Sequence, residues 1–331
     1  MFNISRRVSL IIGLTALALA GGGKAKTKVE NSGGVLWRAP DDIGSRNLLY
    51  GPGGREHEPR GVMTFEEEDH AGSNPKFIVR DSKGVKWTVK LGNEARPETV
   101  ASRLVWAAGY FANEDYFVAD LRVEGMPPHL KRGSKLVTEE GARNARLKRH
   151  NPDEKKVGEW SWRDDPFKDS REWNGLRALM ALINNWDLKD SNNAIYENKK
   201  TGERYYMISD LGAAFGAAGE IYPPRRSKGD LEKYVSSRFI RSETGPFVDF
   251  ATPARPSWKY TVVLPQYLSR IRLEWIGRHV PRSDARWMGE LLSRLSKAQI
   301  RDAFRAAGYS EAEIDQFASV MEARISVLRD L

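Results

Sequence analysis

The spacing of hydrophobic residues changes near the middle of the chain, and this change limits the possible folds more than any other feature. In the first half, short β-type runs occur at Lys76–Arg80 and Val85–Leu91, joined by a tight turn. A helix is predicted at Glu98–Ala108, where hydrophobic residues repeat on one face, and Tyr110–Val123 contains further short strands. Residues 61–124 are therefore predicted to form a small, β-rich N-terminal lobe.

Helical patterns dominate the second half. The segment 125–171 is polar and is predicted to be irregular, but Glu172–Ile183 is a strong helix, followed by a polar loop and two strands at Ala194–Glu197 and Tyr205–Ile208. Further helices are predicted at 267–276, 287–295, 297–307 and 311–331. We therefore expect an α+β chain with two lobes, the second being a mostly helical C-terminal lobe at residues 125–331. A cleft between two such lobes is a common place for a ligand.

The N-terminus has the pattern of a secretory signal peptide. Arg6 and Arg7 precede the apolar run Val8–Ala20, which ends in the small-x-small sequence Ala-Leu-Ala. As a helix this run spans about 20 Å, less than the ~30 Å hydrocarbon core of a bilayer. We therefore predict that residues 1–20 are cleaved and that the mature chain, without a membrane span, is exported to the periplasm or the exterior, with twin-arginine export as one route. Residues 21–60 are rich in Gly, Pro and charge and are predicted to be a linker or an irregular arm.

The composition is typical of a globular protein with an anionic partner. The chain has 331 residues, 53 Lys and Arg against 44 Asp and Glu, a net charge of +9 and no Cys. With 40% hydrophobic and 29% charged residues, it is neither a polytopic membrane protein nor a fully disordered chain. The lack of Cys excludes a disulfide framework, a thiolate nucleophile and zinc sites with Cys ligands. The positive charge suits an anionic partner such as a nucleotide, a nucleic acid or an anionic lipid, and does not choose among them. From the whole sequence we expect a nucleotide and not a nucleic acid.

Four features that bear on chemistry occur in a fixed order along the chain. Lys90 ends a strand, and Glu98 opens the helix that follows it. Asp187 and Asn192 lie in the polar loop of the second lobe, and Asp210 follows a strand within Asp-Leu-Gly. A lysine held by a carboxylate can bind phosphates, while carboxylate and amide oxygens suit Mg²⁺.

This ordered set resembles the protein-kinase-like superfold, which has a strand Lys, a helix Glu, a loop with Asp and Asn five apart, and then Asp-Phe-Gly. Asp187 and Asn192 have this spacing, and Asp210 stands in an Asp-Leu-Gly version of the last motif. The resemblance implies a phosphotransferase that uses ATP with Mg²⁺, or with Mn²⁺, on a protein or small-molecule hydroxyl. It implies that Asp187 orients the acceptor, Lys90 binds phosphate, Glu98 positions Lys90, and Asn192 and Asp210 bind the metal.

The loop before the first strand of the hairpin is atypical for a kinase. It reads Gly-Ser-Asn-Pro-Lys from Gly72 to Lys76 in place of Gly-x-Gly-x-x-Gly. This loop resembles that of the HipA-like branch of atypical kinases, and the phosphatidylinositol kinases and the spore-coat and secretory-pathway kinases share the same reduced motif set. The resemblance implies that Gly72, Ser73 and Lys76 contact the phosphates of the nucleotide.

Three features depart from the ordinary protein-kinase pattern. Asn185 and Trp186 stand where many protein kinases have His and Arg, and no Ala-Pro-Glu follows the Asp-Leu-Gly. Glu98 lies in the first turn of its predicted helix and not in the middle. Glu94 is therefore the alternative partner for Lys90 and a further candidate for the nucleotide site.

Two other functions are open at this point. Export places the protein where ATP is scarce, so one alternative is a non-catalytic kinase-like module that binds an anionic ligand, a glycan or a partner protein. The other is a basic surface-binding protein that acts through the cluster Arg143–Arg149. The five His residues show no metal-ligand spacing.

Overall fold

The computed structural model describes residues 33–72, 74–217, 228–252 and 273–331. The predicted signal peptide at residues 1–20 and Ser73 of the glycine loop lie outside these ranges. None of the helices in the described part has the length and the apolar character that a membrane crossing requires. The described residues from 33 onward belong to one compact unit, which contains both lobes.

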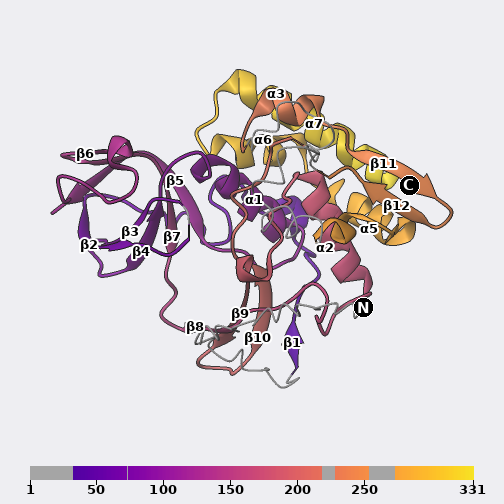
Figure 1. Cartoon of the computed structure of the whole chain (residues 1–331), viewed down its shortest axis with the longest axis horizontal. Coiled ribbons are helices and arrows are strands. Elements are labelled where there is room, and N and C mark those ends of the chain that lie inside the picture. The colour runs from indigo at the N-terminus through magenta and orange to yellow at the C-terminus, as the bar shows by residue number, and fades with distance from the viewer. Residues whose placement is uncertain (1–32, 73, 218–227, 253–272) are drawn as a thin grey trace, which may run out of the picture. The chain divides into compact units, whose positions relative to one another are not determined.

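A six-stranded sheet forms the first lobe (Figure 1). Its strands are β2 (Met63–Asp69), β3 (Lys76–Arg80), β4 (Lys86–Lys90), β5 (Asp115–Glu124), β6 (Val137–Thr138) and β7 (Gly141–Arg149). They lie in the order β4-β3-β2-β5-β7-β6, and a further pairing of β4 with β7 closes five of them into a ring. Within the ring only β2 and β5 run parallel. The predicted hairpin is confirmed as β3 and β4.

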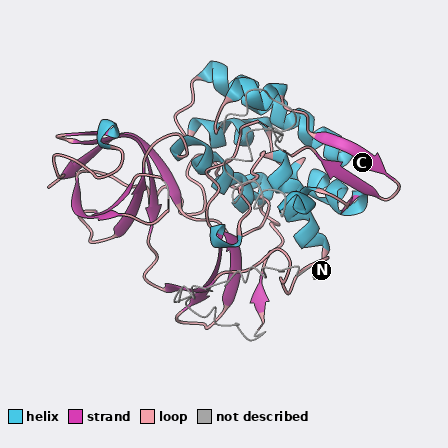
Figure 2. Cartoon of the chain, viewed as in Figure 1, coloured by secondary structure: helices cyan, strands magenta, loops and turns pink. Residues whose placement is uncertain are grey.

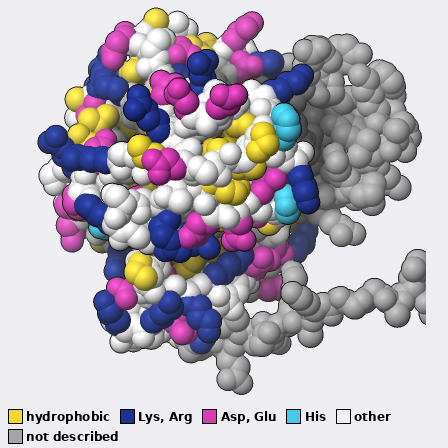
Figure 3. All heavy atoms as spheres, turned by 90° about the vertical axis from the view of Figure 1, so that its left-hand side faces the viewer, with side chains coloured by type: hydrophobic (Ala, Val, Ile, Leu, Met, Phe, Trp, Pro, Cys, Tyr) yellow, Lys and Arg dark blue, Asp and Glu magenta, His cyan; other side chains and the backbone are white. Residues whose placement is uncertain are grey.

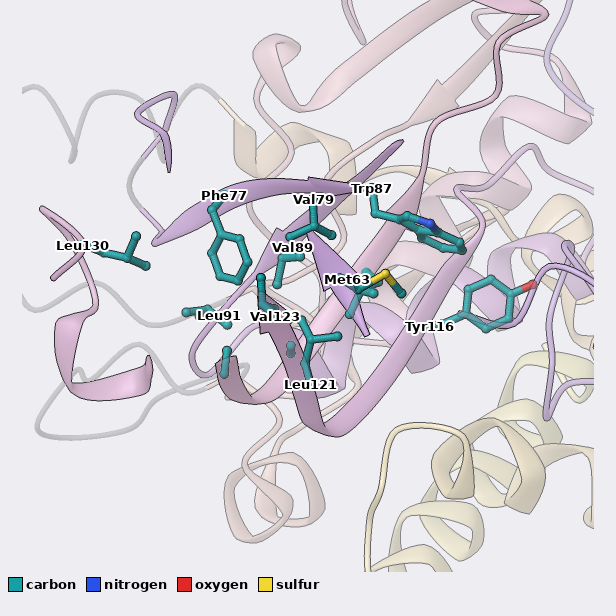
Figure 4. Packing of buried hydrophobic residues seen from close by; sticks show 13 residues of the cluster. Met63, Phe77, Val79, Trp87, Val89, Leu91, Tyr116, Leu121, Val123 and Leu130 are labelled. Carbon is teal, nitrogen blue, oxygen red and sulfur yellow. The ribbon is translucent and has the colours of Figure 1, made fainter. Parts of the chain in front are cut away.

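The inside of the ring is filled by hydrophobic side chains from each of its strands (Figure 4). Trp87 and Val89 of β4 belong to this core, together with Phe77 of β3. Because side chains alternate along a strand, Thr88 and Lys90 of β4 point to the opposite, outer face. Each fully buried side chain of this size contributes about 1.5–3 kcal/mol to stability, so the core holds the strands in a fixed register beneath the site.

Helix α1 (Ala95–Ala107) packs against β5 and β7. It begins at Ala95, three residues before the predicted start at Glu98. Pro97 is compatible with this earlier start, because its missing N–H costs nothing in a first turn where no intrahelical acceptor is needed. Glu94 becomes the N-cap residue, and Glu98 stays in the first turn, so both follow closely on the end of β4.

The sheet continues beyond residue 124, where the sequence predicts the end of the first lobe. The segment 125–171, predicted to be irregular, contributes β6, β7 and β8 (Glu154–Gly158). In β7 the basic side chains hide the hydrophobic alternation. Ala145 and Leu147 belong to the core of the ring, and Arg146 between them is buried as well, although it is charged.

Helices form most of the second lobe (Figure 2). They are α2 (Arg171–Leu182), α3 (Leu231–Ser236), α5 (Arg282–Leu292), α6 (Lys297–Arg305) and α7 (Glu311–Arg329). Helix α7 packs against α3, α5 and α6, and α2 packs against α5. Capping boxes at Ser296 and Ser310 start α6 and α7. The helix predicted at 267–276 falls mostly outside the described residues, and the one predicted at 287–295 begins earlier, at Arg282.

Two smaller sheets complete the described part. One contains β1 (Gly34–Val35), β10 (Arg204–Ile208), β9 (Asn193–Asn198) and β8, and the other contains β11 (Ile240–Thr244), β12 (Phe247–Phe250) and β13 (Val280–Pro281). The two strands predicted in the middle of the second lobe are confirmed as β9 and β10. They follow the polar loop and lead to Asp210, so they place the second half of the site.

The described part of the predicted arm packs against both lobes. Ile43 and Leu48 are fully buried. The side-chain amide of Gln299 in α6 donates to the carbonyl of Ile43 at 2.8 Å, and Arg103 in α1 donates to the carbonyl of Leu49 at 3.3 Å. The two-lobed α+β architecture predicted from the sequence is confirmed.

Candidate functional site

Lys90 ends β4 at a point where three carboxylates meet. Its ammonium nitrogen lies 2.7 Å from Glu98 Oε2, 3.0 Å from Glu94 Oε2 and 3.1 Å from Asp210 Oδ1. The lysine side chain is 5% exposed, and charge pairs interact more strongly away from bulk water. The sequence leaves Glu94 and Glu98 as alternative partners of Lys90, and the structure brings both to it.

The register of the sheet explains why cations gather at this point. Lys90 lies directly opposite Lys76 of β3 on one side and Arg146 of β7 on the other. Side chains of directly opposed residues lie on the same face of a sheet, so the three cations form a row. Their mutual repulsion is offset by carboxylates from neighbouring segments, such as Asp69, whose Oδ2 lies 3.3 Å from the Lys76 nitrogen.

Arg146 connects this cluster to a further buried carboxylate. Its two terminal nitrogens lie 2.9 Å from Glu98 Oε1 and 3.2 Å from Asp115 Oδ1. Glu98 therefore uses one oxygen for Arg146 and the other for Lys90. Burial raises the pKa of Asp115 to about 6, although Arg146 opposes this effect. A chain of alternating charges runs from Asp115 through Arg146, Glu98 and Lys90 to Asp210.

Asp210 follows β10 and reaches Lys90 from the second lobe. Its backbone N–H donates to the carbonyl of Asn192 at 3.3 Å, and its Oδ1 accepts from the N–H of Gly212 at 3.2 Å. Burial by itself would raise the pKa of Asp210, but Lys90 and the Gly212 N–H outweigh burial and hold the pKa below its usual value. Asp210 is therefore ionised at neutral pH, as a metal-binding carboxylate must be.

The polar loop between α2 and β9 carries Asp187 and Asn192. The side-chain amide of Asn192 donates to the carbonyl of Asp187, which closes the loop and leaves the amide oxygen for another partner. The Asp187 side chain is 36% exposed, and its Oδ1 lies 2.7 Å from the Lys189 nitrogen. Within the described ranges, Asp187 makes no contact with the cluster around Lys90 and is linked to Asp210 through Asn192.

The start of this loop is held by the last helix. Arg324 of α7 is buried and donates to the carbonyls of Leu182 and Tyr234, each at 3.0 Å, and to Asn184 Oδ1 at 3.1 Å. Asn184 has φ +52°, a conformation in which Asn is more frequent than most residues. The loop therefore leaves α2 in a direction that one guanidinium group fixes.

The glycine loop lies beside the same cluster. Gly72 has φ +69°, which favours glycine, and its carbonyl accepts from Arg132. Lys76 begins β3 next to Lys90 by register. Asn74 donates its side-chain amide to Glu94 Oε2, so the loop touches the site through a residue that the sequence analysis does not single out.

Lys228 is a second cation at Glu94. Its ammonium group contacts Glu94 Oε1. Burial and, to a smaller extent, the nearby Lys90 lower the pKa of Lys228. The two backbone N–H groups that follow it donate to the carbonyls of Ala214 and Phe215 at 3.0 and 2.9 Å, which ties this segment to the residues after Asp-Leu-Gly.

Four residues of the site were not predicted from the sequence, namely Asn74, Asp115, Arg146 and Lys228. For Arg146 a signal exists, because the core residues Ala145 and Leu147 flank it at strand spacing. Nothing in the sequence places Lys228 against Glu94.

The basic cluster at Arg143–Arg149 does not form one surface. Arg143 is exposed, Arg146 is buried, and burial lowers the pKa of Lys148. Arg149 pairs with Glu114 at 3.5 Å. Figure 3 shows positive and negative side chains interspersed over the face of the first lobe. The structure therefore gives little support to a basic docking surface at this cluster.

The donor set suits a hard divalent cation. Carboxylate oxygens of Glu94, Glu98 and Asp210 lie within 4.8 Å of one another, and Mg²⁺ and Mn²⁺ prefer such ligands. Both oxygens of Glu98 are taken by cations, whereas Asp210 Oδ2 and the Asn192 amide oxygen accept no hydrogen bond from another described residue. Of the three carboxylates, Asp210 is therefore the one with an oxygen left for a metal ion, and the Asn192 amide oxygen is a further available donor in the loop beside it.

Comparison with known proteins gives matches among solved structures alone. No family model matches the chain, and no curated protein matches its sequence. The chain is similar to the Helicobacter pylori proinflammatory kinase CtkA, with 12% identity and a TM-score of 0.46 over 82% of this chain and 97% of that one. It is also similar to the golgi casein kinase, with 12% identity, a TM-score of 0.31 and coverages of 82% and 72%. An apo pseudokinase matches with 11% identity, a TM-score of 0.20 and coverages of 81% and 95%.

The chain has a two-lobed α+β fold, and both lobes supply residues to the site. A β-rich lobe supplies the strand lysine Lys90 and the helix glutamate Glu98, and a mostly helical lobe supplies a polar loop and Asp210 at the end of a strand. The four features that the sequence presents in order are thus arranged around one site, and three of them are in direct contact.

Proposed function

We propose that the chain is a phosphotransferase of the atypical kinase type, which uses ATP with Mg²⁺, or with Mn²⁺ in its place, to phosphorylate a hydroxyl group of a protein or a small molecule. The observation that carries this proposal is the approach of Lys90 Nζ to Asp210 Oδ1, 3.1 Å apart, beside Glu98. A fixed cation and an ionised carboxylate from opposite lobes are what a metal-bound polyphosphate requires.

In this proposal the phosphates lie among residues of both lobes. Lys90 binds the α- and β-phosphates and is positioned by Glu98. Gly72, Ser73 and Lys76 contact the phosphates from the glycine loop, with Glu94 beside them. Asp210 and Asn192 hold the metal ion, which when bound offsets negative charge on the transferred phosphoryl group.

Asp187 is assigned to the acceptor. Its carboxylate orients the acceptor hydroxyl and takes up the hydroxyl proton. The acceptor oxygen forms a bond to the γ-phosphorus, while the bond from that phosphorus to the β–γ bridging oxygen breaks and ADP leaves. The exposure of Asp187, 36%, leaves room for an acceptor to reach it.

A second candidate follows from the same site. We propose that residues 1–20 direct export, and outside the cytoplasm ATP is scarce, so the fold would serve there as a non-catalytic module that binds an anionic ligand, a glycan or a partner protein. The observation that favours this candidate is that the Asp187 carboxylate pairs with Lys189 and, within the described ranges, does not contact the cluster around Lys90.

Thermal unfolding with and without Mg-ATP separates the two candidates. A ligand at 100 times its Kd adds about 2.7 kcal/mol to stability. For a chain of this length that corresponds to a rise in Tm of about 4 °C. We expect such a rise for the wild-type chain, dependent on the metal and lost in Asp210→Asn. Asp302→Asn, which removes a partly exposed carboxylate paired with Arg305, is the control and should behave as wild type. A well-folded protein whose Tm does not respond to Mg-ATP would favour the binding module.

A further inference from the structure

Glu94 receives hydrogen-bond donors from three separate parts of the chain. Lys90 at the end of β4 lies 3.0 Å from its Oε2, and the side-chain amide of Asn74 in the glycine loop donates to the same oxygen. Lys228, from the segment that follows Asp-Leu-Gly, contacts Oε1. The carboxylate is only 6% exposed. Two ammonium groups and an amide that converge on one buried anion form a cradle for negative charge.

The backbone of Gly212 closes one side of this cradle. A Cβ atom at Gly212 would lie 2.7 Å from both Cβ and Oε2 of Glu94, so the Glu94 side chain rests directly on that backbone. Gly212 is tied in turn to Asp210, through the hydrogen bond from its N–H to Oδ1. The Glu94 carboxylate therefore occupies the space beside the residue proposed to hold the metal.

Glu98 differs from Glu94 in a way that gives the two carboxylates separate roles. Glu98 is 1% exposed and is bound on its other oxygen by Arg146, at 2.9 Å, within the first lobe. Lys90 therefore keeps a fixed partner if Glu94 moves away. The groups that donate to Glu94 come from separate segments, so another anion in the position of the Glu94 carboxylate could accept from the same groups.

We propose that Glu94 is an internal occupant of a phosphate-binding cradle, and that the phosphates of the ligand displace it and take over its donors. Asn74 and Lys228 then become phosphate ligands, in addition to the residues named above. A phosphate oxygen accepts from ammonium and amide groups as a carboxylate oxygen does, and a polyphosphate carries more charge and more acceptors. The inference rests on the proposed function only in taking the phosphates to be those of a nucleotide.

The charges at Glu94 argue against its acting as a metal ligand. Two ammonium groups in contact with the same carboxylate would repel a divalent cation placed there. If Glu94 did bind metal, its loss would weaken the binding of Mg-ATP. If it competes with phosphate, its loss strengthens binding, because the cradle no longer has to be emptied first. The two assignments thus predict changes of opposite sign.

Calorimetric titration of the full chain with sodium tripolyphosphate, in the absence of metal, tests the cradle directly. We expect Glu94→Gln to bind tripolyphosphate about fivefold more tightly than wild type, and Lys228→Met about fivefold less tightly or worse. The matched control is Glu66→Gln, because Glu66 of β2 also pairs with two cations, Arg80 and Lys86, away from the site. This control should bind as wild type does. Unchanged or weaker binding by Glu94→Gln, in a protein that still unfolds cooperatively, would overturn the proposal.

A replacement variant and a second titration complete the test. If Glu94→Gln does not fold, Glu94→Asp replaces it, because the shorter side chain withdraws the carboxylate from its donors and should also tighten binding. Titration with Mg-ATP then separates this inference from the proposed function. If Glu94→Gln and Lys228→Met change tripolyphosphate binding as expected but Mg-ATP does not bind, the cradle is supported and the nucleotide assignment is wrong. If Mg-ATP binds and neither Glu94→Gln nor Lys228→Met changes its Kd, the cradle fails and the nucleotide assignment stands.

Discussion

Lys90 Nζ and Asp210 Oδ1 lie 3.1 Å apart, although 120 residues separate them along the chain. One belongs to the closed sheet of the first lobe and the other follows β10 of the second. Their contact depends on how the lobes meet. Glu98, itself paired with Arg146, holds the Lys90 ammonium group, and the Gly212 N–H holds the Asp210 carboxylate. A ligand that binds here must replace or bridge this ion pair, so its affinity should respond to changes on either lobe.

The first prediction concerns Asp187. Asp187→Asn should abolish phosphoryl transfer, because an amide cannot take up the acceptor proton, while the Kd for Mg-ATP should change by less than about threefold. Transfer is measured with labelled ATP and binding by calorimetry. Asp190→Asn, in the same loop but without an assigned role, is the control and should keep both. Parallel loss of binding and transfer in Asp187→Asn would contradict the role given to this residue.

The second prediction concerns Arg146. Arg146→Met removes the cation that the buried carboxylates of Glu98 and Asp115 share, and leaves Lys90 as the one cation paired with Glu98 among the described residues. Removing one partner of a buried ion pair costs about 3–5 kcal/mol. Denaturant unfolding should show this loss, and Mg-ATP binding should weaken because Glu98 no longer holds Lys90 in place. Arg146→Lys should restore part of both. Arg143→Met, at an exposed position of the same strand, should change neither. Equal effects of the two Met variants would show that Arg146 is an ordinary surface residue.

The third prediction concerns the pH dependence of stability. Burial raises the pKa of Asp165 to about 6 from its usual 3.8, its Oδ1 accepts from the Phe167 N–H at 2.7 Å, and its Oδ2 has no hydrogen-bond partner in the described part of the chain. Because the folded-state pKa lies above the unfolded-state value, the folded chain binds the extra proton between these two pH values. Stability should therefore fall as pH rises from 4 to 6, by about 2–3 kcal/mol from this group.

Asp165→Asn checks this sign. The variant keeps an acceptor for Phe167 but cannot ionise, so its unfolding free energy should lack this decline. The comparison is made by denaturant unfolding at pH 4, 6 and 8. A difference between wild type and variant that is the same at all three pH values would rule out the raised pKa as its cause.

The fourth prediction concerns Arg324. Arg324→Met removes the donors that hold the carbonyls of Leu182 and Tyr234 and the side chain of Asn184, so we expect a loss of about 3 kcal/mol in unfolding free energy. Hydrogen exchange in residues 183–193 should increase, because the start of the loop loses its anchor. Arg329→Met, at the exposed end of the same helix, is the control. Unchanged exchange in that loop would mean that Arg324 stabilises the helices alone.

The sequence predicts those site residues that can be recognised from their position relative to strands and helices along the chain. Lys90, Glu98 and Asp210 are recognisable because each sits at the end of a strand or the start of a helix whose pattern is clear. The choice between Glu94 and Glu98 depends on where α1 begins, and Pro97 does not fix that residue because proline is tolerated throughout a first turn. The structure shows that both contact Lys90, which spacing alone could not decide.

Other residues of the site are placed by strand pairing or backbone hydrogen bonds, which the sequence does not reveal. Arg146 lies in a run that reads as a basic surface, and only the pairing of β7 with β4 places it opposite Lys90. Lys228 is placed by backbone hydrogen bonds to Ala214 and Phe215, which have no signature in the sequence. The sheet also extends past residue 124 for the same reason, since the paired charges of β7 conceal a buried strand.

The most direct test of the account is a calorimetric titration of Mg-ATP into the full chain and into Lys90→Met. We predict saturable, metal-dependent binding by wild type, and a loss of affinity of at least about tenfold in the variant, equivalent to 1.4 kcal/mol. Lys90→Arg, which keeps the charge, serves as a second variant should the Met form fail to fold, and it should bind more weakly than wild type because its planar group does not fit the same contacts. Absence of binding by the folded wild-type chain, or equal affinity in wild type and the Lys90 variants, would contradict the assignment of this site to a nucleotide.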